Sequence, residues 1–186
     1  MIPALIIIAV VLALLFLFVI GIYNALIRLR NQVDNAWSQI DVQLKRRHDL
    51  IPNLVETAKG YMKHERGTFE AITNARSQAM GAKTVSEAAK AEGTLGEALS
   101  KFMLVVENYP DLKANQNFLN VQEELTGTEN KIAFSRQNYN DQVLSFNNKI
   151  QMFPSNIIAG MFSFGKRDFF EVEGAAEREV PKVSFS

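Results

Sequence analysis

The chain lacks cysteine altogether, and its 186 residues include only two histidines, His48 and His64. Without cysteine it can form no disulfide, thiolate nucleophile, thiolate metal site or lipobox anchor. Neither histidine has a glutamate three residues before it, and His64-Glu65 has no second histidine at the zincin spacing. The helical zinc and di-iron patterns are therefore missing. We expect a protein that is not an enzyme, with no catalytic residue, no metal and no cofactor.

Neither sign of charge is in excess, because twenty Lys and Arg residues balance twenty Asp and Glu residues. A balanced chain has no global field that would attract nucleic acid. The densest basic run is Lys45 to His48, but consecutive side chains on a helix point about 100° apart, so the run is not one patch. No row of aromatic residues accompanies it, as single-strand binding would require. We expect a solvated helix face here and no nucleic acid partner.

What the chain does have is a long apolar run at its start. Residues 2–23 carry no charge, and sixteen of these 22 residues are Leu, Ile, Val or Phe. A helix of this length rises about 33 Å, which matches the hydrocarbon thickness of a bilayer of about 30 Å. The run has neither the basic start nor the small-residue cleavage motif of a secretory signal. It predicts an uncleaved, single-pass transmembrane anchor over residues 1–27.

The basic residues after the anchor indicate its orientation. Arg28 and Arg30 follow the apolar run closely, and Lys45, Arg46 and Arg47 come within two dozen residues of it. The positive-inside rule places such residues in the cytoplasm. We therefore expect the N-terminus outside and the rest of the chain inside.

Beyond the anchor, apolar residues recur every three or four positions, which is typical of packed helices. The repeats cover residues 33–61, 69–79, 88–106 and 118–153. Only residues 180–185 suggest the alternation of a strand. The sequence therefore predicts an all-α protein.

Local signals between these repeats indicate that the helices fold back on one another. Thr84 and Glu87 have the spacing of a capping box, with Ser86 as the alternative cap. Residues 108–111 contain a proline turn. Pro52 falls inside the first repeat and is expected to kink that helix without ending it.

Together these features predict a transmembrane helix that runs into an elongated antiparallel three- to four-helix bundle, with an irregular C-terminal tail. A single extended coiled coil is the alternative, but the two breaks argue against it. The predicted domains are the anchor (1–27), the helical bundle (28–152) and an apolar tail with a short helix (153–186).

Several segments resemble one known family. The most specific is DLIPNLV at residues 49–55, which follows the basic run, and the match continues through YPDLKA at 109–114, Tyr139-Asn140 and FPSN at 153–156. On these residues the chain resembles the LemA family. The resemblance implies an anchored helical bundle in the inner membrane of a bacterial cell, and an association with membrane proteases of the HtpX type. The family also resembles a magnetosome membrane protein, and it supplies no catalytic residue.

The single tryptophan and several asparagines also lie on or near the apolar stripes of the predicted helices. Trp37, the only tryptophan, lies on the first apolar stripe and is expected in the core, with an acceptor for its indole N–H on the last helix. Asn117, Asn120, Asn138 and Asn147 lie near the seam of the last helix. We expect these asparagines to be solvent-exposed, and a polar layer that sets register or an oligomer interface is the alternative.

The candidate interaction surface lies in the apolar tail. It consists of Phe153, Ile157, Ile158, Met161 and Phe162 on one face of a short helix, followed by Phe169 and Phe170. At about ten residues this helix is too short to span a bilayer. It can pack back on the bundle, contact a neighbouring subunit or partner protein, or enter the membrane surface.

The sequence as a whole favours a non-enzymatic, membrane-anchored scaffold or adaptor. Such a protein would contact membrane lipid, form homo-oligomers and work with a membrane protein such as a protease of the HtpX type. A membrane-shaping oligomer is the main alternative. A ligand sensor is a weaker one, because it would require the bundle to lie outside the cell.

Overall fold

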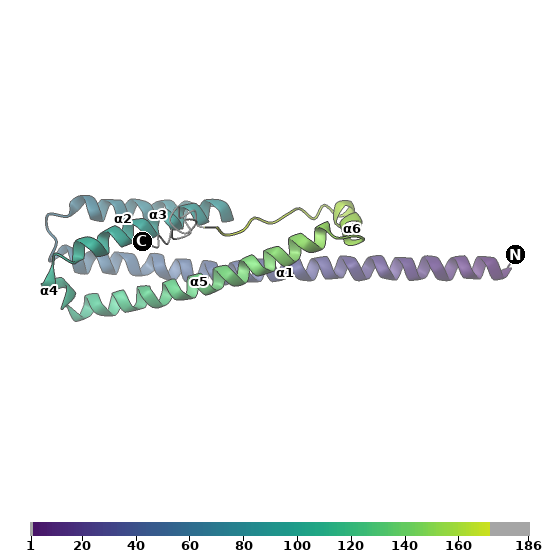
Figure 1. Cartoon of the computed structure of the whole chain (residues 1–186), viewed down its shortest axis with the longest axis horizontal. Coiled ribbons are helices and arrows are strands. Elements are labelled where there is room, and N and C mark those ends of the chain that lie inside the picture. The colour runs from purple at the N-terminus through teal and green to yellow at the C-terminus, as the bar shows by residue number, and fades with distance from the viewer. Residues whose placement is uncertain (1, 172–186) are drawn as a thin grey trace, which may run out of the picture. The chain divides into compact units, whose positions relative to one another are not determined.

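A computed structural model describes residues 2–171, and every regular element within them is a helix. The helices are α1 (Ile2–Lys59), α2 (Arg66–Gly81), α3 (Val85–Val106), α4 (Pro110–Lys113), α5 (Gln116–Gln151) and α6 (Ser155–Met161) (Figure 1). The all-α prediction is confirmed. The strand-like stretch at 180–185 lies outside the described residues.

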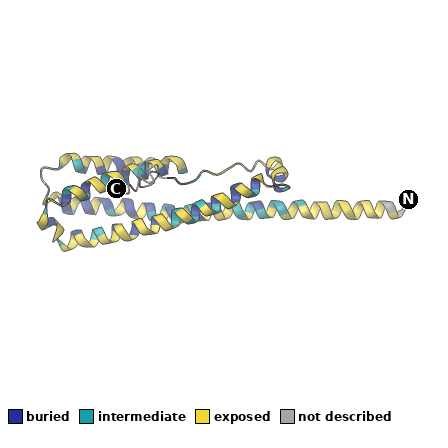
Figure 2. Ribbon diagram, in the orientation of Figure 1, coloured by how far each residue is buried: buried dark blue, intermediate teal, exposed yellow. Residues whose placement is uncertain are grey.

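Helix α1 combines the apolar run and the first amphipathic repeat in one uninterrupted element of 58 residues. Its most apolar 18-residue window has a mean hydropathy of 3.5 and no buried residue, so this part is long and apolar enough to cross a membrane. Figure 2 shows the same stretch as exposed along its length. The helix continues through Pro52, as predicted.

The contacts divide the chain into two units, which are described separately. Of the described residues, unit 1 contains 2–40 together with 135–168, and unit 2 contains 41–134 together with 169–171. Helices α1 and α5 each contribute one part to each unit. The units therefore differ from the domains 28–152 and 153–186 drawn along the sequence, because contacts join segments that lie far apart in the chain.

Unit 2 is a bundle of four helical segments from α1, α2, α3 and α5. Helices α2 and α3 pack against each other, and α4 forms the turn between α3 and α5 (Figure 1). The aromatic rings of Phe69, Phe102 and Phe118 meet in its core, with centroids 6.2 and 6.4 Å apart. Burying one such ring stabilises the fold by about 1.5–3 kcal/mol. The rest of the core is aliphatic, including Ile51, Leu54, Ile72, Leu95 and Leu112.

The predicted capping box starts helix α3. The backbone N–H of Glu87 donates to Oγ1 of Thr84 at 3.2 Å, and the Glu87 carboxylate accepts from the backbone N–H groups of Thr84 and Lys83. These two backbone donors stabilise the ionised carboxylate and lower the pKa of Glu87. The helix start could be predicted because all its partners lie within a few residues.

Unit 1 is built from the first part of α1, the last part of α5, and α6. Its buried residues include Leu26, Val33, Ala36 and Ile40 of α1, Val143, Phe146 and Ile150 of α5, and Ile158 and Ala159 of α6. Trp37 is half-buried, with its ring 5.6 Å from the ring of Tyr139 in an edge-on arrangement. Trp37 thus contributes to the edge of this core and is not enclosed by it.

The irregular segment after α6 is held to unit 1 by polar contacts. The amide of Asn147 donates to the carbonyl of Arg167 and accepts from its N–H, both at 2.9 Å, and the hydroxyl of Tyr139 donates to the carbonyl of Asp168. The guanidinium of Arg167 also pairs with Asp34 at 2.9 Å. Asn147 is buried, so its predicted exposure is wrong: its amide satisfies the backbone of a segment twenty residues away.

Candidate functional site

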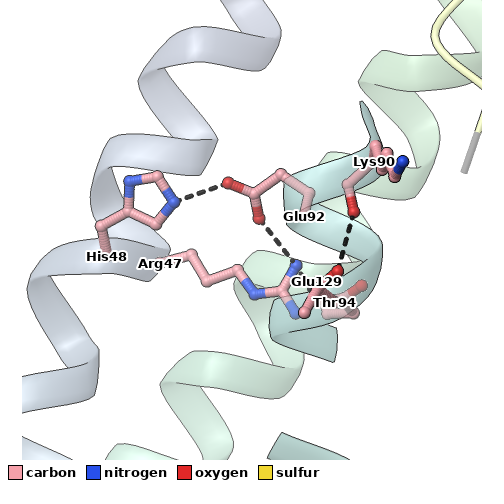
Figure 3. Close-up of polar contacts among 6 residues, drawn as sticks. All are labelled: Arg47, His48, Lys90, Glu92, Thr94 and Glu129. Atoms are coloured by element: carbon pink, nitrogen blue, oxygen red, sulfur yellow. Dashed lines mark hydrogen bonds and ion pairs between the residues drawn. The ribbon is translucent and has the colours of Figure 1, made fainter. Parts of the chain in front are cut away.

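The most unusual feature of unit 2 is a set of ionisable side chains in its interior. Arg47 and His48 of α1 and Glu92 of α3 are only 5, 7 and 4 % exposed (Figure 3). Charged side chains are almost never buried to this degree unless they are paired. Together with Glu129 of α5, which is half-exposed, they form what we call the buried charge cluster.

Both oxygens of Glu92 are engaged within this cluster. Oε1 lies 2.6 Å from Nε2 of His48, and Oε2 lies 3.2 Å from Nη1 of Arg47. An ionised carboxylate can only accept, so the Nε2–H of His48 is the donor. Nη1 of Arg47 also lies 3.3 Å from the carboxylate of Glu129. The cluster therefore joins three helices that are distant in sequence.

The electrostatics of the cluster make it sensitive to helix register. Removing charges from water is costly, and the attraction between them offsets the cost only when each charge meets its partners in good geometry. A shift of α3 against α1 would leave Arg47 or Glu92 buried without its partner. The cluster thus specifies which faces of α1, α3 and α5 meet.

A fourth helix is attached to the same turn of α1 because of Pro52. The carbonyl of His48 would normally accept from the N–H of the residue four positions on, but that residue is Pro52, which has no N–H. Nε of Arg76 on α2 donates to this carbonyl at 2.7 Å. Pro52 thus creates a free acceptor, and Arg76 uses it to fasten α2 to α1.

The cluster corrects one sequence-based expectation. Lys45 and Arg46 are exposed, as predicted, and pair with Asp41 and Glu124. The solvated-face interpretation is wrong for Arg47 and His48, which point into unit 2. Outside the cluster, the hydroxyl of Tyr109 donates to the carboxylate of Glu65 in the same unit, and this hydrogen bond raises the pKa of Tyr109.

One sequence signal would have revealed the cluster. Glu92 follows Ala88 by four residues and precedes Leu95 by three, so it falls on the apolar stripe of α3. A carboxylate on a buried stripe requires a cationic partner. The sequence provided no way to choose that partner among the twenty basic residues.

An apolar groove of about 650 Å³ lies beside the cluster, lined mainly by Leu99, Met103, Leu104 and Leu125, with Arg47 among its lining residues. The ring nitrogen Nε2 of His48 is already occupied by Glu92, and its side chain is buried. Among residues 2–171 no three His, Asp or Glu side chains converge as a metal site would require. The geometry suits the packing of helices better than the binding of a reacting substrate.

The seven tail residues proposed as an interaction surface are divided by the structure. Ile158 and Phe170 are buried, and Phe169 is half-buried. Phe153, Ile157, Met161 and Phe162 are more than half exposed. In unit 1 the ring of Phe162 lies 4.7 Å from that of Tyr23 on α1. Part of the tail is therefore packed, and one apolar face of α6 remains uncovered.

Comparison with known proteins identifies relatives along nearly the whole chain. The chain is 28% identical over 179 residues to Protein LemA of Metamycoplasma hominis, covering 91% of this chain and 80% of that protein. It is 22% identical over 184 residues to Magnetosome protein MamQ 2 of Paramagnetospirillum magneticum, and 21% identical to Magnetosome protein MamQ of Magnetospirillum gryphiswaldense. Each of these two matches covers 85% of this chain and 68% of the relative. A profile of the LemA family matches residues 36–185, and the chain therefore belongs to the LemA family.

Proposed function

We propose that this protein is a non-enzymatic scaffold or adaptor of the LemA type, anchored in the membrane by α1. It works by presenting bundle surfaces to other membrane proteins and to further copies of itself. Its anchor crosses the inner membrane of a bacterial cell once, with the N-terminus outside and the bundle in the cytoplasm. A membrane protease of the HtpX type is the kind of partner such an adaptor would serve.

The observation that carries this proposal is the continuity of α1. One helix runs without a break from an apolar stretch with no buried residue to the buried charge cluster. The residues that connect the anchor to Arg47 and His48 are therefore helical, with no loop between them. The ionisable residues of the interior bind one another, so they support packing and leave the outer surfaces of the helices for contacts.

The absence of cysteine allows a direct test of self-association in membranes. Leu104 and Phe134 are 71 and 76 % exposed, so replacing either one by cysteine should leave the fold intact. We expect oxidative cross-linking of single-cysteine variants to give discrete homo-oligomers from at least one such surface position. The buried position Ala89, at 2 % exposure, supplies a cysteine control of similar size that should not cross-link. A protein that stays monomeric in membranes and in detergent would refute the self-association.

The protease partnership needs a separate test. When the full-length protein and an HtpX-type protease are reconstituted in one bilayer, purification of one of them should recover the other in a stoichiometric complex. The same protease with an unrelated single-pass membrane protein should not form such a complex. Equal recovery with both proteins would contradict the adaptor function.

A membrane-shaping oligomer is the second candidate, and the similarity to two proteins named for the magnetosome favours it. It predicts rings or cages of the full-length protein by negative-stain microscopy and a change in vesicle diameter. The adaptor predicts small oligomers and unchanged vesicles. Particle size in detergent and in vesicles therefore separates the two functions.

The orientation can be tested with the same cysteine variants. A membrane-impermeant thiol reagent added to intact cells should not label a cysteine at Leu104, and it should label it after the cells are opened. Labelling in intact cells would place the bundle outside.

A further inference from the structure

We propose that α6 is an interfacial helix, whose uncovered face lies in the headgroup region of the same bilayer that α1 spans and prefers anionic lipid. The inference requires the membrane anchor but not the scaffold function. It concerns unit 1 alone, in which α1, α5 and α6 are packed together.

The position of α6 along α1 is set by aromatic contacts. The rings of Phe162 and Phe164 lie 4.7 and 5.9 Å from the ring of Tyr23, and the guanidinium of Arg30 lies 5.6 Å from the centre of the Phe164 ring. Buried Ile158 holds the inner face of the helix in the core of unit 1. The helix is therefore docked against α1 at a defined height.

That height is the end of the lipid-exposed part of α1. Large apolar side chains of α1 are more than half exposed from Leu5 to Phe18, and Ile20 is 38 % exposed. Tyr23 comes only three residues after Ile20, about 4.5 Å further along the helix axis. Tyrosine is also enriched at the level of the lipid headgroups, where its ring is apolar and its hydroxyl is solvated. The contact with Tyr23 thus places α6 at the boundary between hydrocarbon and water.

The outer face of α6 is apolar and uncovered, and so is Phe153, two residues before the helix begins at Ser155. Met161 is 70 % exposed and Ile157 is 53 % exposed, and their spacing of four residues aligns them on one side of α6. Phe153 is 80 % exposed. Amphipathic helices at a bilayer surface bury such a face about 5–10 Å into the boundary region. Phe162, which follows Met161, contacts Tyr23 just after the exposed stretch of the anchor, and lipid is the occupant that this neighbourhood favours.

The charges around α6 fit an anionic surface. Between Asp141 and Asp168 the chain has no acidic residue, whereas Lys149 and Lys166 are basic. Arg167 is also basic, but its charge is paired with Asp34. Arg28 and Arg30 on α1 are exposed just beyond Tyr23. Basic residues at this position attract the headgroups of anionic lipids.

Depth-dependent quenching tests the inference on the full-length protein. Single cysteines at Met161 and at Ile157 carry a small fluorophore, and the protein is reconstituted in vesicles whose acyl chains carry bromine. Ile20 provides a matched position on the anchor. Asn35, which is exposed on α1 about 18 Å beyond Tyr23, provides a matched position in water.

We expect the fluorophores on α6 to be quenched nearly as strongly as the one at Ile20, while the one at Asn35 is not quenched. Quenching at α6 should increase when phosphatidylglycerol replaces part of the phosphatidylcholine. It should fall in a Phe153→Ser protein, whose helical circular dichroism should be unchanged because that side chain is 80 % exposed.

Two results would overturn the inference. If the α6 positions behave like Asn35 while Ile20 is quenched, the anchor is inserted but α6 is in water. If cysteines at Met161 cross-link two copies and are shielded from brominated lipid, the face is a contact between subunits. An unquenched Ile20 would refute the anchor and the inference together.

Discussion

Replacing Glu92 by glutamine is expected to destabilise unit 2 far more than an ordinary loss of an ion pair. The variant retains the size of the side chain but removes the charge that compensates Arg47, which stays buried at 5 % exposure. Leaving a buried charge without its partner costs about 3–5 kcal/mol. Arg47 keeps its contact with Glu129 at 3.3 Å, so we expect a value near the lower end of that range.

Thermal unfolding of the full-length protein in a mild detergent, followed by circular dichroism, provides the measurement. A loss of about 3 kcal/mol lowers the Tm of a chain of this size by roughly 6–12 °C. Glu124→Gln is the matched control, because Glu124 pairs with Arg46 at 3.5 Å while both side chains are about half exposed. Such exposed pairs contribute about 1 kcal/mol or less.

A triple variant separates charge from packing. Replacing Arg47, His48 and Glu92 together by Met, Leu and Leu removes the buried ionisable side chains of the cluster and leaves only the half-exposed Glu129. Exchanging buried ion pairs for apolar residues is often neutral or stabilising, so we expect most of the Tm to return. The reasoning is refuted if Glu92→Gln and Glu124→Gln shift the Tm equally, or if the triple variant is less stable than the single one.

Four further predictions concern single contacts, those of Arg76, Tyr139, Thr84 and Glu87. Arg76→Met should lower the free energy of unfolding by about 1–3 kcal/mol. The loss should be much smaller in a Pro52→Ala background, where residue 52 regains the N–H that bonds the His48 carbonyl. Equal losses in urea unfolding of both backgrounds would contradict this. Tyr139→Phe should cost about 1 kcal/mol near neutral pH by removing the bond to Asp168. Burial raises the pKa of Tyr139 from its ordinary value of 10.0. The stabilisation that Tyr139 contributes is therefore complete below about pH 10 and is lost as the pH rises further. The Phe variant should accordingly lose less stability in alkali than the parent protein. Thr84→Ala should cost about 1 kcal/mol through the lost helix cap. The lowered pKa of Glu87 means that its contribution is present above its ordinary value of 4.5 and lost as pH falls through the lowered value, so Glu87→Ala should flatten the acid limb of a stability–pH curve.

The features predicted well are those whose cause is local in the chain. The capping box at Thr84 needs only residues three apart. The break at 108–111 follows from Pro110, whose missing N–H suits the first residue of a helix, and Pro110 starts α4. The apolar stripes of the helices depend only on the period of a helix, and the buried residues follow them closely. Even the continuation of α1 through Pro52 could be predicted, because the pattern resumes its register after the proline.

The candidate site was missed because its partners are far apart in sequence. Glu92 lies 44 and 45 residues from His48 and Arg47, and no local pattern selects those two cations over Lys45 and Arg46 beside them. The same reason explains Asn147, whose amide binds backbone groups of a segment beyond α6. For the tail, the sequence marked an apolar face but could not divide it into packed Ile158 and uncovered Ile157.

The sequence by itself determined that every regular element among residues 2–171 is a helix, that the first helix is apolar enough to cross a bilayer, and that the chain belongs with the LemA family. These properties depend on the composition of the chain and on the spacing of its apolar residues, both of which can be read directly from the sequence. Only the tertiary structure decided that Arg47 and His48 are interior and that α6 docks beside Tyr23. Whether a side chain is buried depends on which helix packs against it, so the role of a charged or apolar side chain can be assigned only when that neighbouring helix is known.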